Sequence, residues 1–154
     1  MISKENSKFE YLTDCNEIDF SLDIIINSIN IKNNFVVEDK YEEKLRKGLN
    51  FGHTIGHAIE THFMSSNKKL LHGEAIAIGI IIESYLSKMM YGFDVKKVDK
   101  IKNHLLTIFP KVKFNFNSIN NIIKVMEHDK KNKNKKVNFV PVSYTHLTLP
   151  TTIE

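Results

Sequence analysis

Apolar residues recur every three or four positions along most of the 154-residue chain, which is the spacing of one face of an α-helix. The first third carries this pattern at Phe9, Leu12, Ile18, Leu22, Ile25, Ile26 and Ile29. Residues 35–37 are β-prone, but the run is short, so we expect helix or a turn there. Further helices are predicted over residues 73–90, 95–108 and 118–127, with Gly92 capping the first of them. The pattern therefore indicates an all-α, multi-helix fold.

The stretch from residue 45 to residue 63 also predicts one continuous helix. At about 100° per residue, Arg46, Asn50, His53 and His57 then fall within an arc of roughly 60°. The rest of the stretch is apolar, and such a polar group is costly to desolvate unless something polar lies beside it. We therefore expect a metal with an anionic substrate on this face.

Three glycines repeat every four residues on the same predicted helix, at Gly48, Gly52 and Gly56. Each costs ~1 kcal/mol of helix propensity relative to alanine. On a continuous helix they would share one face, where a missing side chain lets another backbone or a ligand approach closely.

The helix predicted over residues 73–90 is apolar almost all round, which indicates a position at the centre of the core. Its most apolar run, residues 75–82, is bounded by Glu74 and Glu83. The run is far shorter than the ~20 residues that a membrane span requires, so we expect no membrane partner.

Composition and charge narrow the class of protein. A hydrophobic content of 42% and a charged content of 26% are typical of a globular protein in solution. The net charge of +4 is modest, with acidic residues interleaved, and does not suggest a nucleic-acid partner. Cys15 has no second cysteine to pair with, and residues 1–5 run straight into charge without a signal peptide. We expect a cytoplasmic protein.

Histidine spacing points to a metal. His53 and His57 stand at i and i+4, and His72 follows in the sequence Leu-His-Gly-Glu. A zinc metalloprotease motif is excluded because Thr54 stands where that motif needs a glutamate. A single histidine is more often an ordinary core or surface residue, but the combination with Arg46 and Asn50 argues against that interpretation.

Residues 49–60 (LNFGHTIGHAIE) and 71–79 (LHGEAIAIG) closely resemble the 3-dehydroquinate synthases. The resemblance extends upstream to Lys32, fourteen residues before Arg46, and downstream to an Asp-Lys-Lys motif at residues 129–131. It covers nearly all of residues 1–141, which we expect to form one helical domain that binds metal and substrate.

The resemblance implies a role for each of these side chains. His53 and His72 would be ligands of Zn²⁺ or Co²⁺. Catalytic and substrate-binding roles would fall to Lys32, Arg46, Asn50, His57 and one of Lys130 or Lys131.

The family's chemistry explains these residue types. NAD transiently oxidises a substrate hydroxyl, phosphate leaves, and the ring opens and closes again after the ketone is reduced. A metal acts as a Lewis acid, and cationic side chains suit a small phosphorylated sugar acid. The resemblance also implies a homodimer for the full-length protein.

Two parts of the family's machinery are not recognised in this sequence. Relatives have an NAD-binding α/β domain before the helical one, and their third zinc ligand is a glutamate upstream of the segment that corresponds to residue 1. We therefore expect this chain to be the C-terminal part of a longer gene product, and to be inactive alone.

Three alternatives stay open at this point. Another sugar-phosphate cyclase, such as a 2-deoxy-scyllo-inosose synthase, would share most of the motif, and Asn50 argues moderately against it. A metal-dependent alcohol dehydrogenase of the glycerol type is more distant. The third alternative is a non-catalytic helical module in which the motif is a relic.

The last residues differ in character from the rest. Residues 137–140 are typical of a strand, whereas residues 142–152 look like the translation of a sequencing adaptor. We expect residues 142–154 to be a non-native tail, and we exclude His146 as a ligand.

Overall fold

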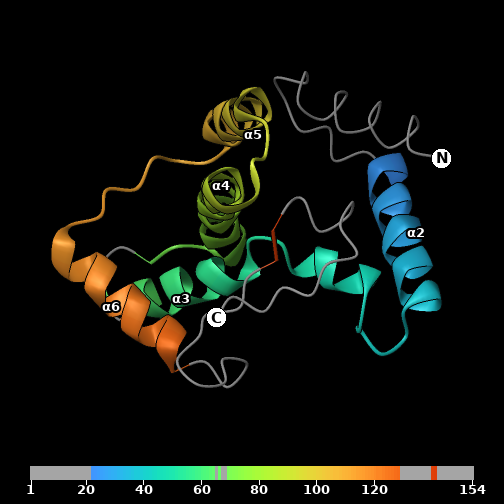
Figure 1. The fold of residues 1–154 in the computed structure, drawn as a ribbon, viewed down its shortest axis with the longest axis horizontal. Helices are drawn as coiled ribbons and strands as arrows, with labels where there is room; N and C mark the ends of the chain where they lie inside the picture. Colours follow the sequence, from blue (N-terminus) through green and yellow to red (C-terminus); the bar gives the residue numbers. More distant parts are fainter. Residues whose placement is uncertain (1–21, 65, 67–68, 129–139, 142–154) are drawn as a thin grey trace.

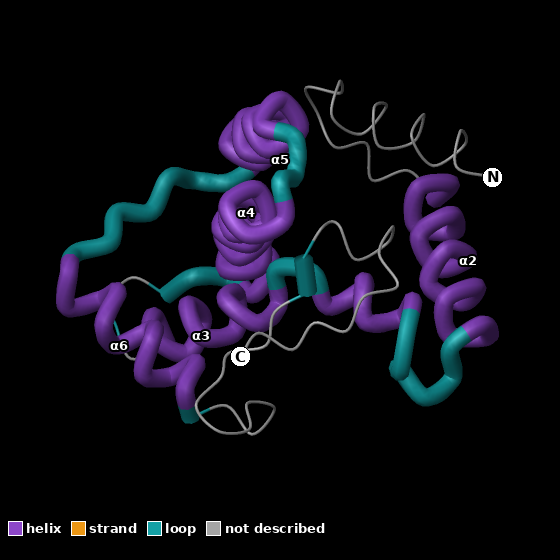
Figure 2. The backbone as a smooth tube through the Cα atoms, viewed as in Figure 1, coloured by secondary structure: helices purple, strands orange, loops and turns teal. Residues whose placement is uncertain are grey.

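The computed structural model describes residues 22–64, 66, 69–128 and 140–141. These residues form five α-helices and one 3₁₀ helix, joined by loops and turns without a strand (Figures 1 and 2). The elements are α2 (Leu22–Glu38), η1 (Leu45–Asn50), α3 (His53–Met64), α4 (His72–Tyr91), α5 (Val95–Ile108) and α6 (Phe116–Glu127). The prediction of an all-α fold is confirmed for this part of the chain.

The core lies where α3, α4 and α6 meet. Its buried members are Ile55, Ala58, Ile59, Ala75 and Ile122. α4 lies between α3 and α5 in Figure 1, and it contacts both of them. The prediction that the apolar helix after residue 72 is central to the core is therefore confirmed, with its ends within one residue of the expected ones and with Gly92 as its left-handed C-cap at φ 70°.

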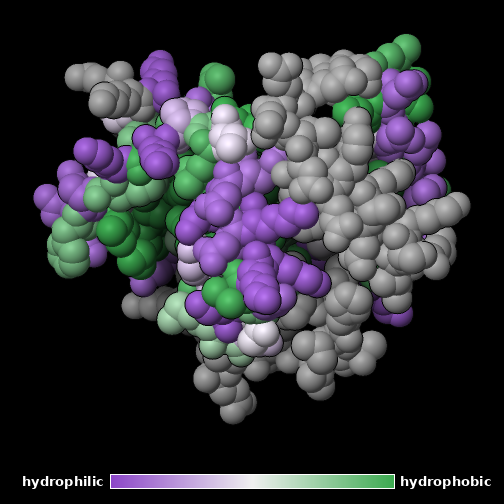
Figure 3. All heavy atoms as spheres, turned by 90° about the horizontal axis from the view of Figure 1, so that it is seen from above, coloured by the Kyte–Doolittle hydropathy of each residue, from purple (hydrophilic) through white to green (hydrophobic). Residues whose placement is uncertain are grey.

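α5 is amphipathic and covers one side of α4. Its buried residues are Val98 and Ile101, while Lys96 and Lys97 are exposed. The helix begins where the Asp94 side chain accepts a hydrogen bond from the backbone N–H of Lys96 at 2.9 Å. Figure 3, which views the molecule from the α5 side, shows hydrophilic residues gathered over the middle of this face.

Backbones of α3 and α4 approach each other very closely at their glycines. A Cβ atom added to Gly79 would lie against the carbonyl oxygen of Gly52 and 2.8 Å from the amide nitrogen of Gly56. One added to Gly56 would lie 3.0 Å from the Cα of Ile76. The predicted close approach is therefore correct for Gly52 and Gly56, but nothing lies within 4 Å of the position that a Gly48 Cβ would take.

The prediction of one continuous helix over residues 45–63 is wrong. The 3₁₀ helix η1 ends at Asn50, the chain turns at Phe51 and Gly52, and α3 begins at His53. Gly52 has φ +81°, which is outside the helical region and is readily adopted by glycine. The narrow arc calculated for Arg46, Asn50, His53 and His57 therefore does not exist, because the first two lie on a different element from the last two.

α2 lies apart from the α3–α6 body and contacts η1 (Figures 1 and 2). It extends through residues 35–37, as expected for helix or a turn there. It carries no buried residue, and its apolar side chains are largely exposed. No helix in the described part of the chain is both long and apolar enough to cross a membrane.

Candidate metal and substrate site

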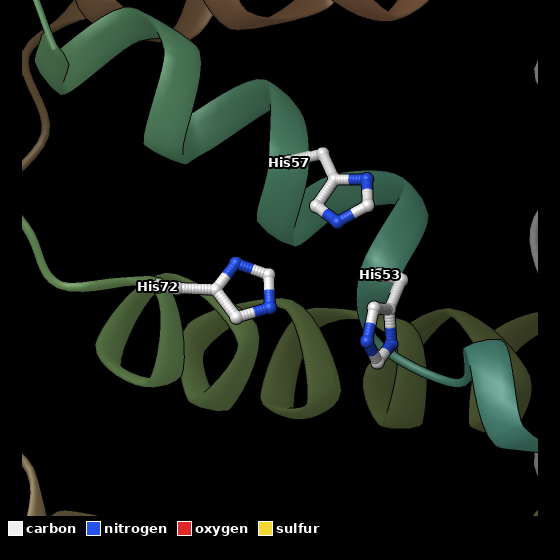
Figure 4. A group of neighbouring side chains, drawn as sticks. All are labelled: His53, His57 and His72. Atoms are coloured by element: carbon white, nitrogen blue, oxygen red, sulfur yellow. The ribbon is translucent and has the colours of Figure 1, made fainter.

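Three histidine rings gather where α3 and α4 begin. His53 is the first residue of α3, His57 lies one turn further along it, and His72 is the first residue of α4. Their ring centroids are 5.4 Å apart for His53–His57, 6.0 Å for His53–His72 and 5.5 Å for His57–His72. Figure 4 shows the three rings pointing into one space between the two helices.

The donor set of this histidine cluster fits a transition-metal ion. One ring nitrogen from each of the three side chains lies within 4.8 Å of the others. Neutral imidazole nitrogens are preferred ligands of Zn²⁺ and Co²⁺. His53 Nδ1 lies 3.3 Å from the backbone oxygen of Phe51, which can only accept, so the contact favours a proton on Nδ1 and a lone pair on Nε2.

A cleft of about 470 Å³ adjoins this cluster and ends at His53. It lies between α2, the turn after it and η1. The side chains that line it are Ser28, Ile31, Lys32, Glu42, Arg46, Leu49, Asn50 and His53. Two cations and an amide therefore share one cavity with a histidine of the cluster.

The turn before η1 is held by the Asp39 side chain. Its Oδ2 atom accepts hydrogen bonds from the backbone N–H groups of Lys44 at 2.7 Å and Arg46 at 3.0 Å, and Oδ1 accepts from Glu43 at 2.9 Å. Desolvation raises the pKa of the Asp39 carboxyl, but these backbone hydrogen bonds and the Arg46 guanidinium lower it below its ordinary value. The carboxylate therefore stays ionised and fixes the main chain that carries Arg46.

Glu42 places a negative charge between two cleft residues. Its carboxylate accepts a hydrogen bond from Asn50 Nδ2, and its Oε2 atom lies 3.9 Å from Nε of Arg46. Arg46 also donates from Nη1 to the backbone oxygen of Lys40 at 3.0 Å. Glu42 adopts φ 58°, a left-handed conformation that is uncommon for a residue with a side chain. These contacts orient both the guanidinium and the amide.

A buried carboxylate from α4 holds the start of α3. The Glu83 side chain is fully buried, and its Oε2 atom accepts from the backbone N–H of Gly52 at 2.7 Å and its Oε1 atom from that of Ile55 at 3.3 Å. These are N–H groups at the beginning of a helix, which have no partner within the helix itself. Burial raises the pKa of the Glu83 carboxyl to about 7, although the hydrogen bonds from backbone N–H groups oppose that shift.

The structure brings most of the predicted site residues into one region. Lys32, Arg46 and Asn50 line the cleft, His57 and His72 belong to the histidine cluster, and His53 belongs to both. Lys130 and Lys131 lie outside the described residues, as do residues 137–139 of the predicted strand and the predicted tail at 142–154.

Three glutamates of this region were not predicted as site residues. Glu60 stands three residues after His57, so helical spacing placed it on the same face of α3, but its contact with His72 on α4 had no local signal. Glu42 stands four residues before Arg46, but in the turn before η1, where helical spacing does not apply. Glu83 was interpreted as the polar boundary of an apolar run. Its burial depends on the start of α3, thirty-one residues away along the chain, which no local pattern reports.

Comparison with known proteins identifies the family. The family model described as "3-dehydroquinate synthase C-terminal" matches residues 2–132. Among similar proteins, the 3-dehydroquinate synthase of Parabacteroides distasonis is 35% identical over 139 residues, which is 89% of this chain and 39% of that protein. The synthase of Picrophilus torridus is 39% identical over 122 residues, covering 78% of this chain and 35% of that protein.

A third relative agrees. The 3-dehydroquinate synthase of Campylobacter jejuni strain RM1221 is 37% identical over 120 residues, covering 78% of this chain and 34% of that protein. The chain thus spans between 34% and 39% of the length of these relatives. With the family model matching most of its residues, the chain belongs to the 3-dehydroquinate synthase family, in the part that the family model describes as C-terminal.

Proposed function

We propose that this chain supplies the metal- and substrate-binding helices of a 3-dehydroquinate synthase. The reaction converts 3-deoxy-D-arabino-heptulosonate 7-phosphate to 3-dehydroquinate and phosphate, in the shikimate pathway to aromatic amino acids. The observation that carries the proposal is that His53 belongs both to a histidine cluster fit for a metal and to a cleft lined by Lys32 and Arg46. Family membership supports the same reaction over that of a 2-deoxy-scyllo-inosose synthase.

His53 and His72 are the proposed metal ligands, for zinc or cobalt. Such an ion, when bound, acts as a Lewis acid that polarises a substrate hydroxyl. The contact of His53 Nδ1 with the oxygen of Phe51 suits this role, because it leaves Nε2 to bind the ion.

Lys32, Arg46 and Asn50 are the proposed substrate contacts in the cleft. A substrate with both a phosphate and a carboxylate group requires cations, and a guanidinium binds either group through two parallel hydrogen bonds. One of Lys130 or Lys131 is proposed to contribute a further cation.

His57 is the proposed proton-transfer residue, because imidazole titrates near neutral pH and lies beside the metal ligands. NAD is the proposed redox cofactor, bound mainly by the part of the relatives that this chain does not span. The setting that we propose is a cytoplasmic homodimer of the full-length synthase, acting on a small molecule rather than on a membrane or nucleic acid.

The proposal is tested in a full-length synthase that carries residues 1–141 in place of the matching segment of the Parabacteroides distasonis enzyme. We expect His53→Ala and His72→Ala to lose their bound zinc and to stop releasing phosphate. A catalytic zinc site has only about three protein ligands, so the loss of one weakens metal binding strongly. His57→Ala should keep its zinc and lose about 10²-fold or more in turnover.

The matched control is His128→Ala, which removes an exposed histidine at the end of α6. It should keep both zinc and activity. A His72→Ala protein with undiminished zinc content would contradict the assignment.

A further inference from the structure

The carboxylate of Glu60 is in contact with one of the proposed metal ligands. Its Oε2 atom lies 3.0 Å from Nδ1 of His72. Glu60 is on α3, one turn beyond His57, whereas His72 opens α4, so the contact joins the two helices that build the histidine cluster.

The chemistry of the two groups fixes where the proton lies. An ionised carboxylate has acceptors and no donor, so the ring nitrogen facing it must carry the hydrogen. A neutral His72 ring is then protonated at Nδ1 and has its lone pair at Nε2. The backbone oxygen of Phe51 favours the same arrangement for His53. Metal-bound histidines commonly donate their second N–H group to a carboxylate or carbonyl in this way.

Packing alone does not hold the His72 ring. Its side chain is 55% exposed, while that of Glu60 is 28% exposed. An exposed ion pair of this kind contributes little to folding stability, and it is an ion pair only while the histidine is protonated. We therefore expect Glu60 to affect the orientation of the His72 ring more than it affects folding stability.

We propose that Glu60 is a positioning residue of the metal site, which holds His72 in the Nδ1–H tautomer with Nε2 directed at the metal. The inference rests on the proposed function in one respect, the role of His72 as a metal ligand. Loss of the carboxylate should leave the ring free to rotate and to adopt the Nε2–H tautomer, in which the ligand atom is occupied by a proton.

The tautomer is measured first, on the whole metal-free chain labelled with ¹⁵N-histidine, by long-range ¹H–¹⁵N correlation at a pH where His72 is neutral. We expect the Nδ1–H tautomer in the unsubstituted chain and a shift towards Nε2–H in Glu60→Ala. Glu127→Ala, which removes an exposed carboxylate from the end of α6, should leave His72 unchanged. A His72 ring that is Nε2–H in the unsubstituted chain overturns the proposal.

Metal affinity is measured next, by titrating the same proteins with Zn²⁺ in a calorimeter and with Co²⁺ by absorption spectroscopy. Glu60→Ala should bind about 10- to 100-fold more weakly, with an unchanged melting temperature, whereas Glu127→Ala should bind as the unsubstituted chain does. The metal affinity of Glu60→Gln should lie between those of Glu60→Ala and the unsubstituted chain, because the glutamine amide oxygen still accepts a hydrogen bond from Nδ1 of His72.

Two other outcomes separate this inference from the proposed function. Equal affinities of Glu60→Ala and the unsubstituted chain would overturn the positioning role, while the metal site itself would stand. An unsubstituted chain that has the expected tautomer and binds neither metal would overturn the ligand role of His72 in this chain, and the positioning role with it.

Discussion

Arg46 shows how much support a single cleft residue receives. Asp39 fixes its main chain, Glu42 lies beside Nε, and the Lys40 carbonyl accepts from Nη1. The guanidinium is thus oriented before any anion arrives, which reduces the entropy lost on binding.

Replacing Arg46 by lysine tests that orientation. A lysine keeps the charge but lacks the planar pair of donors, so it cannot bind a phosphate or carboxylate through two parallel hydrogen bonds. In the full-length synthase we expect Arg46→Lys to raise the KM for the heptulosonate phosphate about 10-fold or more, with unchanged zinc content. Steady-state kinetics and metal analysis measure the two quantities.

Lys47→Ala is the control for this substitution. Lys47 is the next residue, is exposed, and does not line the cleft. If both variants had the KM of the unsubstituted enzyme, Arg46 would not be a substrate contact.

At the scale of elements, most helices were predicted from the sequence, but the turn that separates η1 from α3 was not. α4 and α5 were predicted within a residue because their apolar spacing and the Gly92 cap are local signals. The break before His53 depends on Gly52 at φ +81° and on the Glu83 carboxylate, which accepts from the freed N–H groups. The apolar spacing of residues 45–63 is compatible with one continuous helix. The carboxylate that stabilises the break comes from α4, so nothing within these residues indicates it.

The structure nevertheless brings Lys32, Arg46, Asn50 and His53 around one cleft, while the role of each side chain stays a prediction. The motif carries this information independently of the helix geometry. The carboxylates of Glu42, Glu60 and Glu83 were missed because each one contacts a residue of another element.

Gly79 lies where the close packing of α3 against α4 leaves no room for a side chain. An alanine Cβ there would meet the carbonyl oxygen of Gly52 and the amide of Gly56, and backbone atoms cannot rotate away. We expect Gly79→Ala to destabilise the chain by about 1–3 kcal/mol and to weaken Zn²⁺ binding, since His53 and His72 lie on the two helices that must separate. Chemical denaturation and zinc titration measure both effects.

Gly73→Ala makes the same change on the same helix, but into open space. It should leave stability equal or slightly higher, because alanine favours helix. A Gly79→Ala chain as stable as Gly73→Ala would mean that the helices can move apart without cost.

At the scale of the whole molecule, Glu83 makes folding stability depend on pH. The pKa of the Glu83 carboxyl is about 7 in the folded chain and is expected near its ordinary value of 4.5 in the unfolded chain, so the folded state binds more protons between these two pH values. The free energy of unfolding should therefore decrease as pH rises from about 4.5 to 7, by up to roughly 3 kcal/mol from this group, and level off above pH 7.

The substitution Glu83→Gln isolates the pH-dependent contribution of Glu83 to the free energy of unfolding. Glu83→Gln does not titrate, so the difference in unfolding free energy between the two proteins should change across that pH interval, to the disadvantage of the unsubstituted chain at higher pH. Urea denaturation at several pH values gives the difference. A difference that is constant with pH would show that the Glu83 pKa is the same in both states.

The whole chain by itself is predicted to be inactive. It spans at most 39% of the relatives described above, and NAD is proposed to bind outside that part. Supplying purified chain with Zn²⁺, NAD⁺ and the heptulosonate phosphate should release phosphate no faster than buffer does. Release above that rate would show that these helices contain a self-sufficient active site.

The histidine cluster is also local in sequence, since its three members lie within residues 53–72 and come from one pair of adjacent helices. Contacts between residues near in sequence form quickly, because little chain entropy is lost in closing a short loop. The metal site can therefore assemble early in folding, before α2 completes the cleft around Lys32. An ion bound at that stage would stabilise the packing of α3 against α4, and the cleft side chains of α2 would then be added last.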